Sequence, residues 1–259
     1  MSNIIGLVNK MNILISNDDG VDSAGLTALA EKLSNLNNVL VVAPDGNRSA
    51  SSHSLTLSGK VRLKKISKET RFDKYSLSGT PADCVKFAEL VFNDFRTDIV
   101  VSGINKGHNI GSDILYSGTV SVACEASFFG HTSFAFSAFS YNESDLSGYS
   151  DYAAKIIDTL LPMSVKGDIW NVNFPDVSPS KIKGVKITGL GKQIYSDRYV
   201  KVSDNEYILV GSPLHNIEND EDCDVEWIKK GYVTVTPVLF NKTNYERITE
   251  VKGKCEKLL

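Results

Sequence analysis

Short apolar runs, each ended by a polar or Pro/Gly-containing stretch, recur through the first two thirds of the chain. Such runs, bounded by turn residues, are typical of strands that are buried on both faces of a parallel sheet. They predict strands at residues 12–16, 39–43, 99–101, 134–139 and 168–174.

Amphipathic segments with apolar residues at helical spacing separate these runs. They predict helices at residues 26–33, 81–91, 120–129 and 153–160. Asp22 or Ser23 can cap the first of them, and Thr80 followed by Pro81 is a typical start for the second. The alternation of strand and helix predicts an α/β fold whose mainly parallel sheet carries helices on both faces.

The helical periodicity weakens after residue 175. Strand patterns at 185–188, 207–211 and 232–238 surround an acidic loop at 218–224 and predict β-rich extensions of the core. The first ten residues precede the first predicted strand and have no expected role in a site. We therefore divide the chain into an N-terminal extension (1–10), a core (11–175) and β-rich C-terminal arms (176–259).

Composition narrows the functional classes. The 259 residues are 42% hydrophobic and 23% charged with a formal net charge of -3, which excludes a disordered chain and argues against a general nucleic-acid binder. No apolar run approaches the roughly 18 residues that a membrane span needs. The four cysteines (Cys84, Cys124, Cys223 and Cys255) have no C-x-x-C spacing, so we expect reduced thiols and a cytoplasmic protein.

Polar clusters follow three of the predicted strands, at residues 17–20, 47–49 and 103–105. The carboxyl ends of parallel strands share one edge of a sheet, and ligands of open α/β sheets bind there. A fourth cluster, at residues 116–119, precedes a predicted helix whose N-terminus suits an anion such as phosphate. We therefore expect all four clusters to face one crevice.

Asp18 and Asp19 are the most informative pair. Two carboxylates held close together need a proton or a cation, although Asp-Asp-Gly is also common in solvated turns and helix caps. Ser49 and Asn105 would add neutral oxygens, and such a set suits a hard cation such as Mg²⁺ or Mn²⁺. The four histidines have no zinc-ligand spacing; His108, within a glycine-rich loop, remains a candidate general acid.

The ordered motifs resemble the SurE family (survival protein E), which are metal-dependent nucleoside monophosphate phosphatases. The similarity is dense from residue 11 to about 130 and returns near the C-terminus. Its blocks are Ile13–Val21, Val42–Asp45 with Asn47–Ser49, Ser54–Leu57, Gly79–Val85, Val101–Asn105 with Gly107 and Asn109, Tyr116–Val120 and Gly231–Pro237. Departures are Ala50 in place of the usual glycine and the absence of an Asp-Pro-Arg-Gly-rich segment at 195–211.

The resemblance implies a Rossmann-like core and one divalent cation per subunit, Mg²⁺ or Mn²⁺ with Co²⁺ as a further candidate. The implied metal ligands are Asp18, Asp19, Ser49 and Asn105, with both aspartates also catalytic. The expected substrate and phosphate contacts are Asn17, Asn47, Gly103, Ser117, Gly118 and Thr119. The C-terminal arms are expected to exchange between subunits in a homodimer or homotetramer.

The expected activity is hydrolysis of nucleoside 5′- and 3′-monophosphates, with short polyphosphate as a further substrate, and with no nucleic-acid polymer or membrane as partner. The alternative is a metal-dependent nucleotide-binding or sensor protein without turnover. A receiver domain would need an aspartate after the central strand, where this chain has Asn105. A haloacid-dehalogenase-type phosphatase would need Asp-x-Asp, which Asn17-Asp18-Asp19 lacks.

Overall fold

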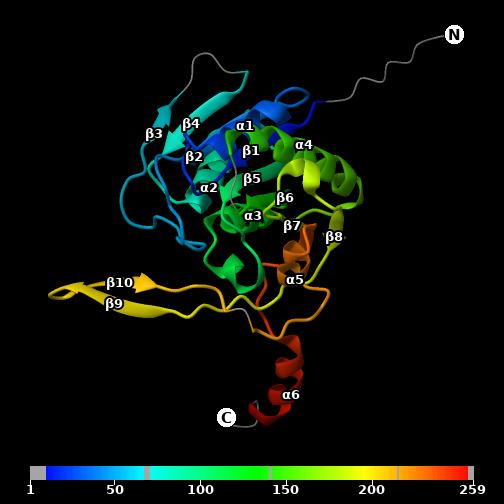
Figure 1. The fold of residues 1–259 in the computed structure, drawn as a ribbon. Helices are drawn as coiled ribbons and strands as arrows, with labels where there is room; N and C mark the ends of the chain where they lie inside the picture. Colours follow the sequence, from blue (N-terminus) through cyan, green and yellow to red (C-terminus); the bar gives the residue numbers. More distant parts are fainter. Residues whose placement is uncertain (1–9, 67–70, 140–141, 215, 256–259) are drawn as a thin grey trace.

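A computed structural model describes residues 10–66, 71–139, 142–214 and 216–255 (Figure 1). Almost the whole predicted N-terminal extension, residues 1–9, lies outside the described residues. Within the described part of the chain, no helix has the length and hydropathy needed to cross a bilayer.

The main sheet confirms the predicted α/β fold. Its nine strands have the order β3-β4-β2-β1-β5-β6-β7-β11-β8, and all neighbours are parallel except β3–β4 and β7–β11. The strands are β1 (Asn12–Ser16), β2 (Asn38–Pro44), β3 (Leu63–Lys65), β4 (Asp73–Leu77), β5 (Ile99–Lys106), β6 (Thr132–Ala138), β7 (Ile169–Phe174), β8 (Val185–Ile187) and β11 (Val233–Val238).

The first two helices begin where the capping residues predict, whereas α4, predicted from residue 153, already begins at Glu143. Ser23 caps α1 by accepting the backbone N–H of Leu26, and Thr80 forms a capping box with Asp83 at the start of α2. The α-helices are α1 (Ala24–Leu33), α2 (Pro81–Val91), α3 (Gly118–Phe128), α4 (Glu143–Leu160), α5 (Asp224–Lys229) and α6 (Tyr245–Cys255). Short 3-10 helices are η1 (Gly111–Leu115), η2 (Leu161–Met163) and η3 (Pro179–Lys181).

Helices cover both faces of the sheet, as expected. The side chains of α1 and α4 pack with Ile13 and Ile15 of β1 in one core, whereas those of α2 and α3 pack with Leu14 in the other. Successive strand residues point to opposite faces, so a continuous apolar strand serves both cores. This explains why the strands appear as unbroken apolar runs.

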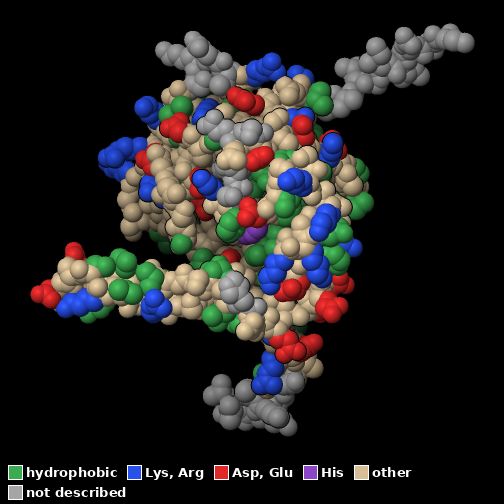
Figure 2. Space-filling model, viewed as in Figure 1, with side chains coloured by type: hydrophobic (Ala, Val, Ile, Leu, Met, Phe, Trp, Pro, Cys, Tyr) green, Lys and Arg blue, Asp and Glu red, His purple; other side chains and the backbone are tan. Residues whose placement is uncertain are grey.

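The C-terminal third divides between the sheet and a projection. β8 and β11 extend the main sheet, while β9 (Arg198–Ser203) and β10 (Glu206–Val210) form a separate antiparallel hairpin that projects from the body (Figure 1). Tyr199, Tyr207 and Leu209 are exposed on this hairpin, and Figure 2 shows its hydrophobic surface. An isolated two-stranded hairpin is marginally stable, and exposed apolar surface is typical of interfaces. Arm exchange between subunits remains a prediction.

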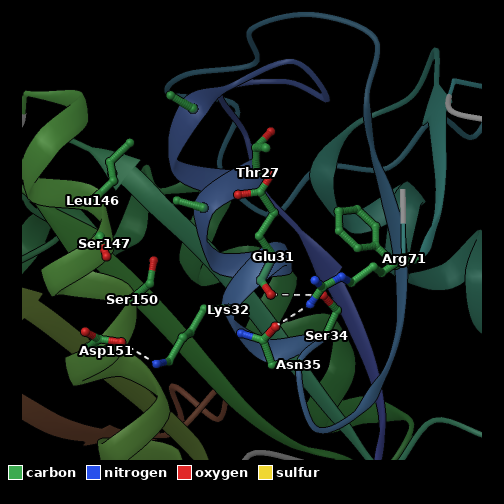
Figure 3. A pocket seen from close by; sticks show the side chains of 13 residues that line it. Thr27, Glu31, Lys32, Ser34, Asn35, Arg71, Leu146, Ser147, Ser150 and Asp151 are labelled. Atoms are coloured by element: carbon green, nitrogen blue, oxygen red, sulfur yellow. Dashed lines mark hydrogen bonds and ion pairs between the residues drawn. The ribbon is translucent and has the colours of Figure 1, made fainter. Parts of the chain in front are cut away.

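A cavity of about 880 Å³ lies between α1 and α4 (Figure 3). Lys32 of α1 forms an ion pair with Asp151 of α4, and Arg71 donates to the side chain of Asn35 at 2.7 Å. None of the ten predicted site residues lines this hollow. The candidate site therefore lies at the carboxyl ends of the strands and not in this cavity.

Candidate active site

The carboxyl ends of β1, β2 and β5 are neighbours, because β1 lies between the other two strands. The backbone N–H of Arg48 donates to the carbonyl of Asp18 at 2.7 Å, which joins the loop after β2 to the loop after β1. The backbone N–H of Lys106 donates to Oδ2 of Asp19 at 3.1 Å, which joins the end of β5 to the same loop. The structure thus brings the segments that carry Asp18, Asp19, Ser49 and Asn105 to one edge.

Asn105 lies inside β5, whereas the sequence pattern predicted a strand that ends at Val101. The pairing with β6 is irregular between Ser102 and Asn105 and then resumes, with Asn105 opposite Ser137. The polar residues of this stretch concealed the continuation of the strand. Its consequence is that Asn105 is held by a sheet and not by a loop.

Asp18 is a buried carboxyl, 4% exposed, at the N-terminus of α3. The Thr119 hydroxyl donates to its Oδ1 at 2.5 Å, and the backbone N–H of Gly118 also donates to it. Burial raises the pKa of Asp18 to about 6; the bond from Thr119 opposes this rise, and the charge of Asp19 reinforces it. The hydrogen bonds that the protein offers to the Asp18 carboxylate therefore do not fully offset the cost of burying its negative charge.

Asp19 is less buried. Burial raises its pKa above the usual range, although the backbone N–H and the charge of Lys106 oppose that rise. Two neighbouring carboxyls with raised pKa values fit a divalent cation, which would supply the missing positive charge. Among the described residues no group of three or more His, Cys, Asp or Glu side chains converges, so any cation here also needs neutral oxygens.

Ser49 and Asn105 are the residues predicted to supply such oxygens. Asn105 is buried and donates through Nδ2 to the carbonyl of Gly107 at 2.8 Å, which leaves its amide oxygen on the other side of the group. Ser49 is exposed, and its backbone N–H donates to Oδ1 of Asn47 at 2.7 Å. The role of these four residues as a metal-ligand set remains a prediction.

The three residues predicted to contact phosphate at the start of α3 all have partners within the protein. Ser117 caps α3 by accepting the N–H of Val120 at 3.0 Å, and Thr119 donates its hydroxyl to Asp18. Gly118 packs directly on Asp18: a Cβ on this glycine would lie 2.6 Å from the Asp18 Cβ. Their geometry supports a role in holding Asp18, and direct contact with phosphate remains a prediction.

Asn17 has a similar internal role. Its side chain donates to the carbonyl of Gly20 at 3.0 Å and to the Ser23 hydroxyl at 2.7 Å, and it accepts the N–H of Gly20. It thereby fixes the Asp18–Asp19 turn to the start of α1. Asn47 shapes the loop of Ser49 in the same way, so contact of either asparagine with substrate remains a prediction.

The backbone conformation at residue 103 requires glycine. Its φ is +118°, and a Cβ would lie 2.3 Å from the carbonyl oxygen of Phe136.

We expect Gly103→Ala to destabilise the fold by about 3 kcal/mol or more, because both the left-handed conformation and the close approach forbid a side chain. Chemical denaturation measures this, with Gly189→Ala, where the Cβ would meet open space, as the control. Equal stability of the two variants would contradict the conclusion that the backbone at residue 103 requires glycine.

His108 is bound to the end of β7. Its Nε2 lies 2.7 Å from the Phe174 carbonyl, so this nitrogen is the donor, and burial lowers the pKa of the ring below its usual range. A neutral imidazole whose proton is directed to a carbonyl is poorly suited to act as a general acid. The geometry supports a structural role in holding the glycine-rich loop.

Asp224 is a structural residue that the sequence pattern missed. It is fully buried at the start of α5, where the pattern predicted only the end of an acidic loop. Its carboxyl accepts the backbone N–H groups of Gly111 at 2.9 Å and Gly191 at 2.8 Å, and burial raises its pKa. It joins η1, which precedes α3, to the C-terminal segment.

Comparisons with known proteins place the chain in a family. The profile of the family "Survival protein SurE" matches residues 13–197. A protein called 5′-nucleotidase SurE from Thermoanaerobacter sp. (strain X514) is 42% identical over 242 residues, 92% of this chain and 96% of the relative. A protein of the same name from Caldanaerobacter subterraneus is 39% identical over 251 residues, which are 95% of this chain and 98% of the relative.

A solved structure shows the same fold. The crystal structure of the SurE protein from Aquifex aeolicus superposes with a TM-score of 0.81 at 37% identity, covering 93% of this chain and 98% of that one. The family profile spans the end of β1 and the two aspartates that follow it. This chain therefore belongs to the SurE family.

Proposed function

We propose that this chain is a divalent-metal-dependent phosphomonoesterase that hydrolyses nucleoside 5′- and 3′-monophosphates to nucleoside and phosphate, with short polyphosphate as a further substrate. The observation that carries the proposal is the Asp18–Asp19 pair, two adjacent carboxyls where the segments after β1, β2 and β5 meet. Burial, which raises the pKa of both carboxyls, is consistent with this. The relatives named 5′-nucleotidase SurE support the choice of nucleotide as substrate.

Asp18, Asp19, Ser49 and Asn105 would hold the cation, which we propose to be Mg²⁺, Mn²⁺ or Co²⁺. When bound, such a cation neutralises phosphate oxygens and lowers the pKa of a water molecule. Thr119 and Gly118 fix the Asp18 carboxyl, so that its position does not depend on the substrate. Asp19 is the less buried carboxyl, and we propose that it accepts the proton of the attacking water.

The N-terminal end of α3 gives the site a preference for anions. The positive end of the helix dipole lies beside Asp18, and it would also favour a phosphate group brought to the same edge. Arg48 is bound to Asp45 at 2.9 Å, so its charge is partly compensated. We propose that the helix end contributes to phosphate binding together with Asn17, Asn47, Gly103 and Ser117–Thr119.

An assay of phosphate release tests the function. A panel of nucleoside 5′- and 3′-monophosphates with short polyphosphate is incubated with Mg²⁺, Mn²⁺ or Co²⁺, and in parallel with a chelator. We expect repeated turnover with at least one cation and none with chelator, because the carboxyls alone cannot neutralise phosphate. Nucleotide binding measured by calorimetry without any release of phosphate would favour the sensor alternative.

A further inference from the structure

The loop that carries Ser49 takes its shape from its contacts with other elements. Residues 45–62 connect β2 to β3 without helix or strand, and Ser49 itself is exposed. Ala50 and Ser52 have left-handed φ angles of 56° and 54°, which such residues seldom adopt without support from their surroundings. Contacts with residues outside the loop must therefore hold this conformation.

Attachments on both sides of Ser49 supply that support. On one side the backbone N–H of Arg48 donates to Asp18. On the other side the backbone N–H of Ser52 donates to the Tyr116 carbonyl at 3.0 Å, and Thr56 donates to Asp83. His53 lies between these contacts and has the only ionisable side chain of residues 49–59.

His53 binds a buried carboxylate that the proposed reaction does not use. Its Nε2 lies 2.8 Å from Oε2 of Glu125, a residue of α3 whose side chain is 3% exposed. Lys86 of α2 lies 2.7 Å from the other oxygen. Burial opposes ionisation, but the hydrogen bonds from His53 and Lys86 outweigh it and hold the pKa of Glu125 below its usual range. The carboxylate is therefore a charged anchor inside the fold.

A ring contact fixes the other side of His53. The imidazole stacks on Phe128 at a centroid distance of 5.8 Å, and Phe128 contacts Phe240 at 4.5 Å. The same α3 thus holds Asp18 through its first turn and His53 through its later turns. This arrangement gives the Ser49 loop and Asp18 a common rigid support.

We propose that His53 and Glu125 are a positioning pair that holds the Ser49 loop in register with the Asp18–Asp19 site. This inference rests on the proposed function for its catalytic consequence. Loss of the pair removes one of the attachments of the loop and increases its motion, so the position of the Ser49 oxygen becomes less well defined before a cation binds. We expect about a tenfold loss of both cation affinity and kcat, since small errors in position are costly in catalysis.

The test compares His53→Ala with His131→Ala in the full chain. His131 forms a second histidine–glutamate pair with Glu89 at 3.0 Å; its side chain is 17% exposed, against 31% for His53, and its partner lies in α2 and not in the Ser49 loop. Three quantities are measured: hydrogen exchange of the amides at 49–57 without metal, the Mn²⁺ dissociation constant by calorimetry, and kcat and KM with a nucleoside monophosphate.

We expect His53→Ala to accelerate exchange at 49–57, raise the Mn²⁺ dissociation constant about tenfold and lower kcat more than it changes KM, while His131→Ala changes none of these. His53→Gln, which keeps a neutral donor toward Glu125, should restore most of the loss and serves also if the alanine variant folds poorly. Unchanged exchange and Mn²⁺ affinity in His53→Ala, or equal effects in His131→Ala, would overturn the positioning role. A wild-type chain that binds Mn²⁺ but releases no phosphate would instead refute the nucleotidase function.

Discussion

Replacing Asp18 with asparagine should reduce phosphate release at least about a thousandfold and also make the metal-free protein more stable. The first effect follows because a buried charge directed at the proposed cation is lost, and such electrostatic groups dominate catalysis. The second follows from the pKa of about 6, because the folded protein holds the proton of Asp18 more tightly than the unfolded chain does.

The effect of Asp18 on stability depends on pH. Because the pKa of Asp18 is raised in the folded state, the free energy of unfolding of the metal-free wild type decreases as pH rises from about 4 to 6. Above pH 6 this free energy stays lower by about 3 kcal/mol, which is the cost of ionising Asp18 inside the fold. Asp18→Asn removes this cost, so denaturation at pH 8 without metal should show a gain of about 1–3 kcal/mol. Near pH 3 the two proteins should be equally stable.

Asp22→Asn is the matched control for this prediction. Asp22 lies in the same turn but is exposed, so its replacement should change neither activity nor stability by a measurable amount. A metal-free Asp18→Asn protein that is less stable than wild type at pH 8, or that retains activity, would show that Asp18 is an ordinary structural carboxyl.

Gly118→Ala should abolish most activity without unfolding the protein. The added Cβ would lie 2.6 Å from the Asp18 Cβ and 2.9 Å from its Oδ2, so the carboxyl must move. Gly118 is the first residue of α3, where alanine is otherwise favourable, and the loss of stability should remain below about 2 kcal/mol. We expect a loss of kcat of about a hundredfold, as displacement by 1 Å in an active site commonly causes.

Gly189→Ala is the control for Gly118→Ala, because a Cβ at residue 189 would meet open space. Steady-state kinetics with a nucleoside monophosphate, together with thermal denaturation, separate the two effects. Full activity of Gly118→Ala would mean that Asp18 tolerates displacement and is not the fixed ligand we propose.

The central fold could be predicted from the sequence because its strands are buried on both faces. Unbroken apolar runs at β1, β2 and the start of β5 therefore stood out against the amphipathic helices between them. β3 was missed because all three of its residues are exposed, and β9 because Arg198 and Lys201 interrupt its apolar residues. Its hairpin partner β10 was predicted at 207–211 because its apolar run is unbroken. The helix α5 was missed because its acidic start resembles a solvated loop.

The candidate site could be predicted in outline for a related reason. Strand ends in a parallel sheet meet at one edge, so polar residues after β1 and β2 were expected to meet. The direction of each side chain could not be read from the pattern. Thr119 donates to Asp18 and Asn17 binds its own turn, because a buried carboxyl and a tight loop require internal hydrogen bonds. The contact of His53 with Glu125 joins residues 72 apart in sequence, which no local pattern records.

The most direct test of the account is the anomalous scattering of Mn²⁺ in a crystal of this protein soaked with the ion. We predict one strong peak per subunit at the ends of β1 and β5, within roughly 2.0–2.4 Å of oxygens of Asp18, Asp19, Asn105 and Ser49. A peak elsewhere, or no peak at these strand ends while phosphate release still requires Mn²⁺, would contradict the site.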